Sequence, residues 1–169
     1  MRTWIILALL WGGVAMAANP NRISIREGIV GGIVAPHVRF EGTAVQQPDG
    51  TARVAVRNGK QETFCGTWSA DLWKKYRSLI DENNVFTLPV ENPAGGEDIY
   101  GFDRSLAVTL DGHTWRNGGP GGCIHMSSMV QANPVEKKRF DVASTSLEKA
   151  MQEAVHRCSA EEYRQVTAP

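Results

Sequence analysis

Apolar and polar residues alternate along several stretches of this chain, with the two-residue period of a half-buried β-strand. Residues that favour tight turns separate these stretches, among them Asn58 with Gly59 and Asp111 with Gly112. The alternation predicts strands around Ile23 and Ile25, and over 38–45, 52–56, 62–65, 105–110 and 113–116.

A helical period follows the fourth of these strands. Ser69 has the side chain of an N-cap, and the apolar residues after it recur at three- and four-residue intervals. This spacing predicts a helix that ends near Asn83 and Asn84. The apolar residues that define it are Leu72, Tyr76, Leu79 and Ile80.

A second helical pattern lies near the end of the chain. Thr145 and Glu148 have the spacing of a capping box, in which each side chain satisfies a free backbone N–H group. We expect a terminal helix from there, with residues 161–166 either extending it or fraying. Its apolar face comprises Leu147, Met151, Ala154, Val155 and Cys158.

Together these elements predict an α+β fold: an antiparallel sheet of four to six strands, with two helices packed on one face. Residues 18–169 are expected to form a single domain, which has the length of one globular unit. A loop-rich insertion is expected at about 117–143.

The first 17 residues have the pattern of a secretory signal peptide. Arg2 precedes an apolar run, and Ala15 and Ala17 supply a small-residue cleavage site. The apolar run is shorter than the roughly 20 residues of a membrane span. We therefore expect cleavage after Ala17, no remaining membrane anchor, and a periplasmic or extracellular protein.

The charge of the chain is balanced, with 18 basic and 18 acidic residues. A nucleic-acid-binding domain normally carries a basic excess, so nucleic acid is not an expected partner.

The chain contains three cysteines, Cys65, Cys123 and Cys158. An oxidising compartment favours one disulfide and leaves one thiol over, and the sequence leaves all three pairings open. Because Cys158 falls on the apolar face of the expected terminal helix, where a buried thiol is ordinary, the pairing Cys65–Cys123 is favoured. Cys158 is the alternative partner.

Two cysteines and two histidines also have the chemistry of a zinc site, namely Cys123, His125, His156 and Cys158. On a helix, however, His156 and Cys158 point to different faces. We therefore expect no metal or cofactor. A periplasmic metal-binding or redox protein that uses these four residues is the alternative.

Catalytic chemistry has weaker support in the sequence. Cys123 with His125 or His113 as its base lacks a third, orienting residue. The acidic residues at 97, 98 and 103 match no calcium loop. A small enzyme is a further alternative.

Two loops rich in Gly and Pro, 91–102 and 117–127, are expected to be presented from the rigid sheet. Tyr and Trp near such loops are typical of protein-binding surfaces, although core packing is the more common use of each ring. The binding residues predicted on these loops are Asp98, Tyr100, Phe102, Gly118 and Pro120.

The order of elements is similar to that of small bacterial secreted α+β domains, including the emfourin-type inhibitors of thermolysin-like metalloproteases. The resemblance covers roughly 22–117 and the last helix, and it includes the glycine turn at Gly31 and Gly32, the acidic loop at 97–100 and the strand at 106–110. It implies a secreted protein that binds another protein. The sequence thus predicts a non-catalytic protein-binding module, a protease inhibitor being one form, whose partner is another secreted or periplasmic protein.

Overall fold

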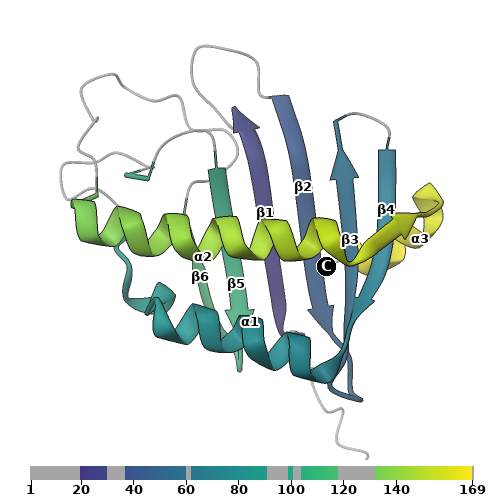
Figure 1. Cartoon of the computed structure of the whole chain (residues 1–169), viewed down its shortest axis with the longest axis horizontal. Coiled ribbons are helices and arrows are strands. Elements are labelled where there is room, and N and C mark those ends of the chain that lie inside the picture. The colour runs from purple at the N-terminus through teal and green to yellow at the C-terminus, as the bar shows by residue number, and fades with distance from the viewer. Residues whose placement is uncertain are drawn as a thin grey trace, which may run out of the picture.

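A computed structural model describes residues 20–29, 37–59, 62–90, 99–100, 104–117 and 132–168. They form an α+β structure with seven strands in one antiparallel sheet (Figure 1). The strands are β1 (Arg22–Ile29), β2 (His37–Gln46), β3 (Ala52–Asn58), β4 (Glu62–Trp68), β5 (Arg104–Leu110), β6 (His113–Arg116) and β7 (Val155–Arg157). The helices are α1 (Ala70–Glu82), the short 3-10 helix η1 (Val85–Thr87), α2 (Pro134–Glu153) and α3 (Ala160–Thr167).

The strands lie in the order β6-β5-β1-β2-β3-β4-β7. Four strands that follow one another in the chain form the centre, the β5–β6 hairpin extends one side, and β7 extends the other. The hairpin turns at Asp111 and Gly112, whose φ angles of 51° and 80° are those of a two-residue turn with both residues left-handed.

Helices α1 and α2 cross the same face of the sheet, and α3 lies against the opposite face (Figure 1). The alternation in β1 explains the main core, because Ile23 and Ile25 point to the α1–α2 face and are fully buried. The same face also buries Trp68, Trp73, Val54, Val56, Leu106, Val108, Phe140, Leu147 and Met151.

Two glycines let α2 approach this face closely. A Cβ at Gly42 would lie 2.6 Å from the Met151 sulfur, and one at Gly66 would lie 1.8 Å from the Ala154 carbonyl oxygen. The second contact is with backbone, so only glycine fits on β4 at the point where α2 ends and the chain turns into β7.

The predicted fold class is confirmed, but its details need correction. The sheet has seven strands instead of four to six, and the missed strand is β7, whose three residues are too short to show alternation. The described ranges contain three helices longer than one turn instead of two. The third, α3, has its own capping box between Ser159 and Glu162 and does not extend the terminal helix.

The start of α2 also differs from the prediction. Asn133 is its N-cap, and its side chain accepts hydrogen bonds from the backbone N–H groups of Val135 and Glu136. Residues 134–143 therefore belong to the helix and not to a loop-rich insertion. Thr145 and Glu148 lie within α2, where both side chains accept hydrogen bonds from Arg104, at 2.6 and 2.9 Å.

Candidate functional site

Tyr100, predicted to bind a partner, belongs to the core. Its side chain is 3% exposed, its hydroxyl donates to the Pro89 carbonyl at 2.8 Å, and its ring stacks on Phe140 with centroids 4.5 Å apart. The prediction was wrong because the polar neighbours of Tyr100 in sequence indicated an exposed loop, whereas its ring packs under α2. Asp98, Phe102, Gly118 and Pro120 lie outside the described residues.

The tryptophans near the predicted turns are core residues as well. Trp68, Trp73 and Trp115 are each 4% exposed or less. Two of them are anchored through the indole N–H: Trp115 donates to the Leu88 carbonyl at 2.8 Å, and Trp68 to the Ala150 carbonyl at 3.4 Å. They therefore supply no aromatic binding surface.

The disulfide joins Cys65 to Cys158, with Cα atoms 5.6 Å apart, and not Cys65 to Cys123. The prediction failed because it placed Cys158 on a helix. In the structure β7 pairs with β4 so that His156 lies opposite Cys65, and this pairing brings Cys158 to the α3 side of the sheet. A disulfide of this kind fits a secreted or periplasmic protein.

The disulfide also removes one member of the proposed metal set, because Cys158 carries no free thiolate. His156 is exposed on β7, and Cys123 and His125 lie outside the described residues. Within the described ranges, no three His, Cys, Asp or Glu side chains are grouped as metal ligands. Of the described helices, none combines the length and apolarity that a membrane span requires.

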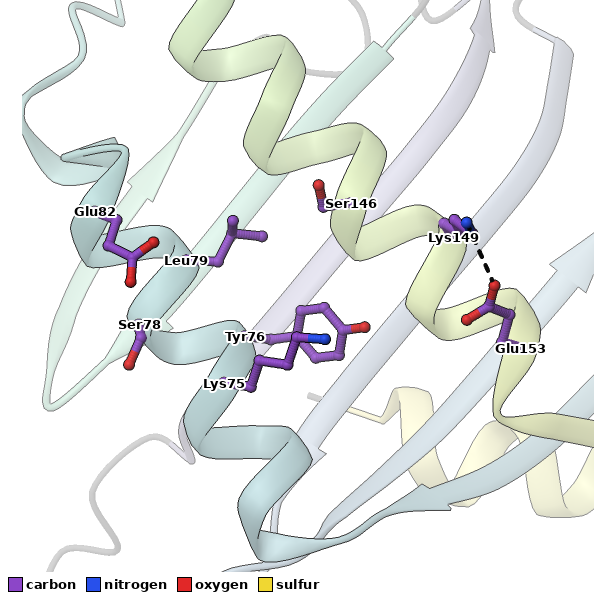
Figure 2. A pocket seen from close by; sticks show the side chains of 8 residues that line it. All are labelled: Lys75, Tyr76, Ser78, Leu79, Glu82, Ser146, Lys149 and Glu153. Atoms are coloured by element: carbon purple, nitrogen blue, oxygen red, sulfur yellow. Dashed lines mark ion pairs between the residues drawn. The ribbon is translucent and has the colours of Figure 1, made fainter.

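A groove of about 500 Å³ lies between α1 and α2 (Figure 2). Tyr76 and Leu79 form its apolar part, and the Tyr76 ring packs on Trp68 with centroids 4.8 Å apart. Burial, and to a lesser extent the Glu153 carboxylate, raise the pKa of the Tyr76 phenol. The remaining lining is Lys75, Ser78, Glu82, Ser146, Lys149 and Glu153.

The charges of this groove are balanced. Two lysines face two glutamates, and Lys149 pairs with Glu153 at 3.8 Å. The groove therefore has no excess charge with which to select a ligand. Its exposed ion pair contributes little to the stability of the fold.

The opposite face of the sheet carries a second hollow, of about 310 Å³, on the part that α3 leaves uncovered. We call this part of the sheet, formed by β6, β5, β1 and the adjoining residues of β2, the open face. Because side chains alternate along β1, Arg22, Ser24 and Arg26 all point to it while the isoleucines point to the core.

The register places small side chains at the centre of the hollow. Ser24 lies opposite Thr43 on β2 and Ala107 on β5, and Ala107 lies opposite Arg116 on β6. The Ser24 and Thr43 hydroxyls are hydrogen-bonded at 3.1 Å. Arg22 and Arg26 lie two residues to either side of Ser24. Together with Arg116, they surround these small side chains with three arginines.

Asn117 fixes the strand end that carries Arg116. Its side chain is 1% exposed; the amide oxygen accepts from the Leu106 N–H at 2.7 Å, and the amide nitrogen donates to the Arg104 carbonyl at 3.2 Å. The side chain thus continues the pairing with β5 beyond the end of β6.

Glu41 is the carboxylate of the hollow, and its charge is already compensated. Arg26 donates to it at 2.8 Å from Nε, Arg57 donates from Nη2, and the Tyr163 hydroxyl donates at 3.2 Å. Burial, followed by the negative charge of Glu41, raises the pKa of Tyr163 to about 12.

Helix α3 forms one wall of the hollow. Val166 and Tyr163 pack on Val45 and Ala55 beside the disulfide. Thr167 lines the hollow, and the carbonyl of Ala168 accepts a hydrogen bond from Arg22.

No protein-family model matches this chain, and no curated protein sequence matches it. The function is therefore inferred from the residues of the site itself. Sequence reasoning missed the open face, although the alternation of Arg22, Ser24 and Arg26 with two isoleucines already places both arginines on the non-core side of a strand.

Proposed function

We propose that this protein is a non-catalytic binding module of the periplasm or cell exterior that docks an acidic partner protein on the open face. The observation that carries the proposal is the charge of the hollow. Among the described residues, Arg22, Arg26 and Arg116 line it together with one carboxylate, Glu41, which already has two arginine partners. A negative partner surface complements this excess, which favours rapid and selective association.

The architecture supports the same proposal. The sheet is held from one side by α1 and α2, and α3 is tied to the other side by the disulfide. A rigid surface loses little conformational freedom when it binds, so more of the contact energy appears as affinity. Inhibition of a metalloprotease, which the resemblance to emfourin-type domains implies, is one form such binding takes.

The test compares capture of partners by two variants that each add a tryptophan. Ala107→Trp fills the hollow, since Ala107 lies between Ser24 and Arg116. Ser78→Trp adds the same ring to the α1–α2 groove, where Ser78 is exposed. Tagged protein covering 18–169 is incubated with the host's periplasmic and secreted fractions, and captured proteins are quantified by mass spectrometry.

We expect Ala107→Trp to reduce capture of a stoichiometric partner about tenfold or more, which corresponds to about 1.4 kcal/mol. Ser78→Trp should capture as much as the wild type. Equal capture by all three proteins, or loss only with Ser78→Trp, would refute docking on the open face. Captured proteases are then assayed for inhibition, and undiminished activity removes the inhibitor form of the proposal.

A further inference from the structure

At the β2 edge of the open face, one carboxylate is already held by two arginines. Two arginines, Arg26 and Arg57, donate to the single carboxylate of Glu41. The guanidinium of Arg57 also lies over the Tyr163 ring, 5.7 Å from its centroid. Arginine suits this role because its planar group presents several donors in fixed directions.

A second pair of arginines, Arg22 and Arg116, lies in the same hollow and has no such carboxylate among the described residues. Arg22 donates to the neutral carbonyl of Ala168, and its Nε is buried without a hydrogen-bond partner. A buried donor left unsatisfied costs about 1–3 kcal/mol. No ion pair or hydrogen bond joins the Arg116 side chain to another described residue, and Arg116 is exposed.

These two arginines are placed to share one ligand. In the register, Arg22 lies opposite Thr109, Thr109 lies opposite Thr114, and Arg116 follows two residues later. The spacing and rise of strands then separate the two Cα atoms by about 12 Å. Arginine side chains are long enough for both guanidinium groups to reach one ligand above the small side chains of Ser24 and Ala107, once Arg22 has turned from the Ala168 carbonyl to which it donates.

We propose that the hollow takes the carboxylate of an Asp or Glu side chain from the partner's acidic segment, held by Arg22 and Arg116. This inference depends on the proposed function and names the group that anchors the partner. The ratio of two guanidinium groups to one carboxylate repeats the arrangement around Glu41. Arg26 remains on Glu41, and the Ser24 and Ser105 hydroxyls line the same hollow.

The test measures binding of fluorescein-labelled hexaglutamate by anisotropy at about 50 mM salt, where surface charges are less screened than at physiological ionic strength. Arg22→Gln/Arg116→Gln removes two positive charges from the open face. Lys75→Gln/Lys149→Gln removes two from the α1–α2 groove and is the matched control. Arg116→Gln alone is included because Arg116 has no described contact whose loss would disturb folding.

We expect the arginine double variant to bind about tenfold more weakly or worse, and the lysine double variant within about twofold of the wild type. Arg116→Gln should account for several-fold of the loss. Equal weakening by both doubles would show that only net charge matters and would overturn the proposal, as would no binding by the wild type.

Inorganic phosphate, with the ionic strength held constant by sodium chloride, distinguishes the source of the anion. Little displacement of hexaglutamate at equimolar phosphate supports a peptide carboxylate, and complete displacement assigns the site to a small oxyanion and overturns the proposal. The two proposals fail in different ways. If Ala107→Trp blocks capture of the partner but the arginine double variant captures it normally, the docking face is supported and the anchor formed by Arg22 and Arg116 is refuted. If hexaglutamate binds as predicted but Ala107→Trp captures the partner normally, the docking proposal is refuted instead.

Discussion

The two faces of the sheet bury apolar surface to very different extents. The α1–α2 face holds the main core, with large side chains such as Trp68, Trp73 and Phe140 at 1% exposure or less. In the part of the chain that the structure describes, the other face has only a small apolar cluster under α3, which contains Val45, Ala55, Tyr163 and Val166 and adjoins the disulfide. Its remaining area carries arginines, serines and threonines.

Under the proposed function, this difference separates the face that stabilises the fold from the face that binds the partner. Burial of apolar surface is the main favourable term in folding, so the α1–α2 face supplies most of the stability. The open face is then free to carry charge that contributes little to the fold. Substitutions on the two faces should therefore have effects of different size and kind.

The largest effect is expected from a core substitution under α2. Phe140→Ala removes a ring that packs against Tyr100 and Trp115. The free energy of unfolding should fall by about 3–5 kcal/mol. A smaller truncation in the α3 cluster, Val166→Ala, should cost about 1.5 kcal/mol, since it removes two methyl-sized groups. Urea unfolding measures both, and similar losses for the two variants would contradict the contrast between the faces.

The disulfide should have the next largest effect. Cys65→Ala/Cys158→Ala opens a link between residues 93 apart in sequence, and the free energy of unfolding should fall by about 2–4 kcal/mol. Hydrogen exchange should accelerate first in α3, because Cys158 lies directly before it. Protection of α3 equal to that in the oxidised wild type would show that the helix holds its place without the link.

Tyr163 should make stability depend on pH in the alkaline range. Burial and the Glu41 carboxylate raise its pKa from 10.0 to about 12, so the folded protein favours the neutral phenol. This contribution is fully present below pH 10 and is lost as the pH rises through 12. In urea titrations between pH 8 and 12, the wild type should lose more stability than Tyr163→Phe; parallel curves would contradict the expectation.

The smallest effect on folding should come from the open face itself. Arg116→Gln should change the free energy of unfolding by no more than about 0.5 kcal/mol, as is usual for an exposed residue without described contacts. Urea unfolding of the variant beside the wild type measures this difference. A large loss would show that Arg116 supports the fold and would weaken its assignment to binding.

Most of the fold was predictable from local patterns. The alternation in β1, the turn at Asp111 and Gly112, and the N-cap Ser69 were all confirmed. These features depend on neighbouring residues, so one sequence is sufficient to show them. β7 was missed because a three-residue strand pairs through long-range contact with β4 and shows no period of its own.

The candidate site was harder to predict for the same reason. The sequence places Arg22 and Arg26 on one face of a strand, but it does not say that β5 and β6 add Arg116 beside them. It also favoured the wrong cysteine partner, because the return of the chain along β4 brings Cys158 to Cys65. Long-range register, which local patterns do not encode, defines both features.

The most direct test of the central claim is to map acidic-peptide binding on the 15N-labelled protein, residues 18–169, by NMR. Hexaglutamate is titrated in, and the shifts of backbone amides are followed. We predict that the largest shifts cluster at Ser24, Ala107 and Arg116 on the open face, while Lys75 and Lys149 in the α1–α2 groove shift little. Shifts centred on the groove, or spread evenly over both faces, would contradict a division between a structural face and a binding face.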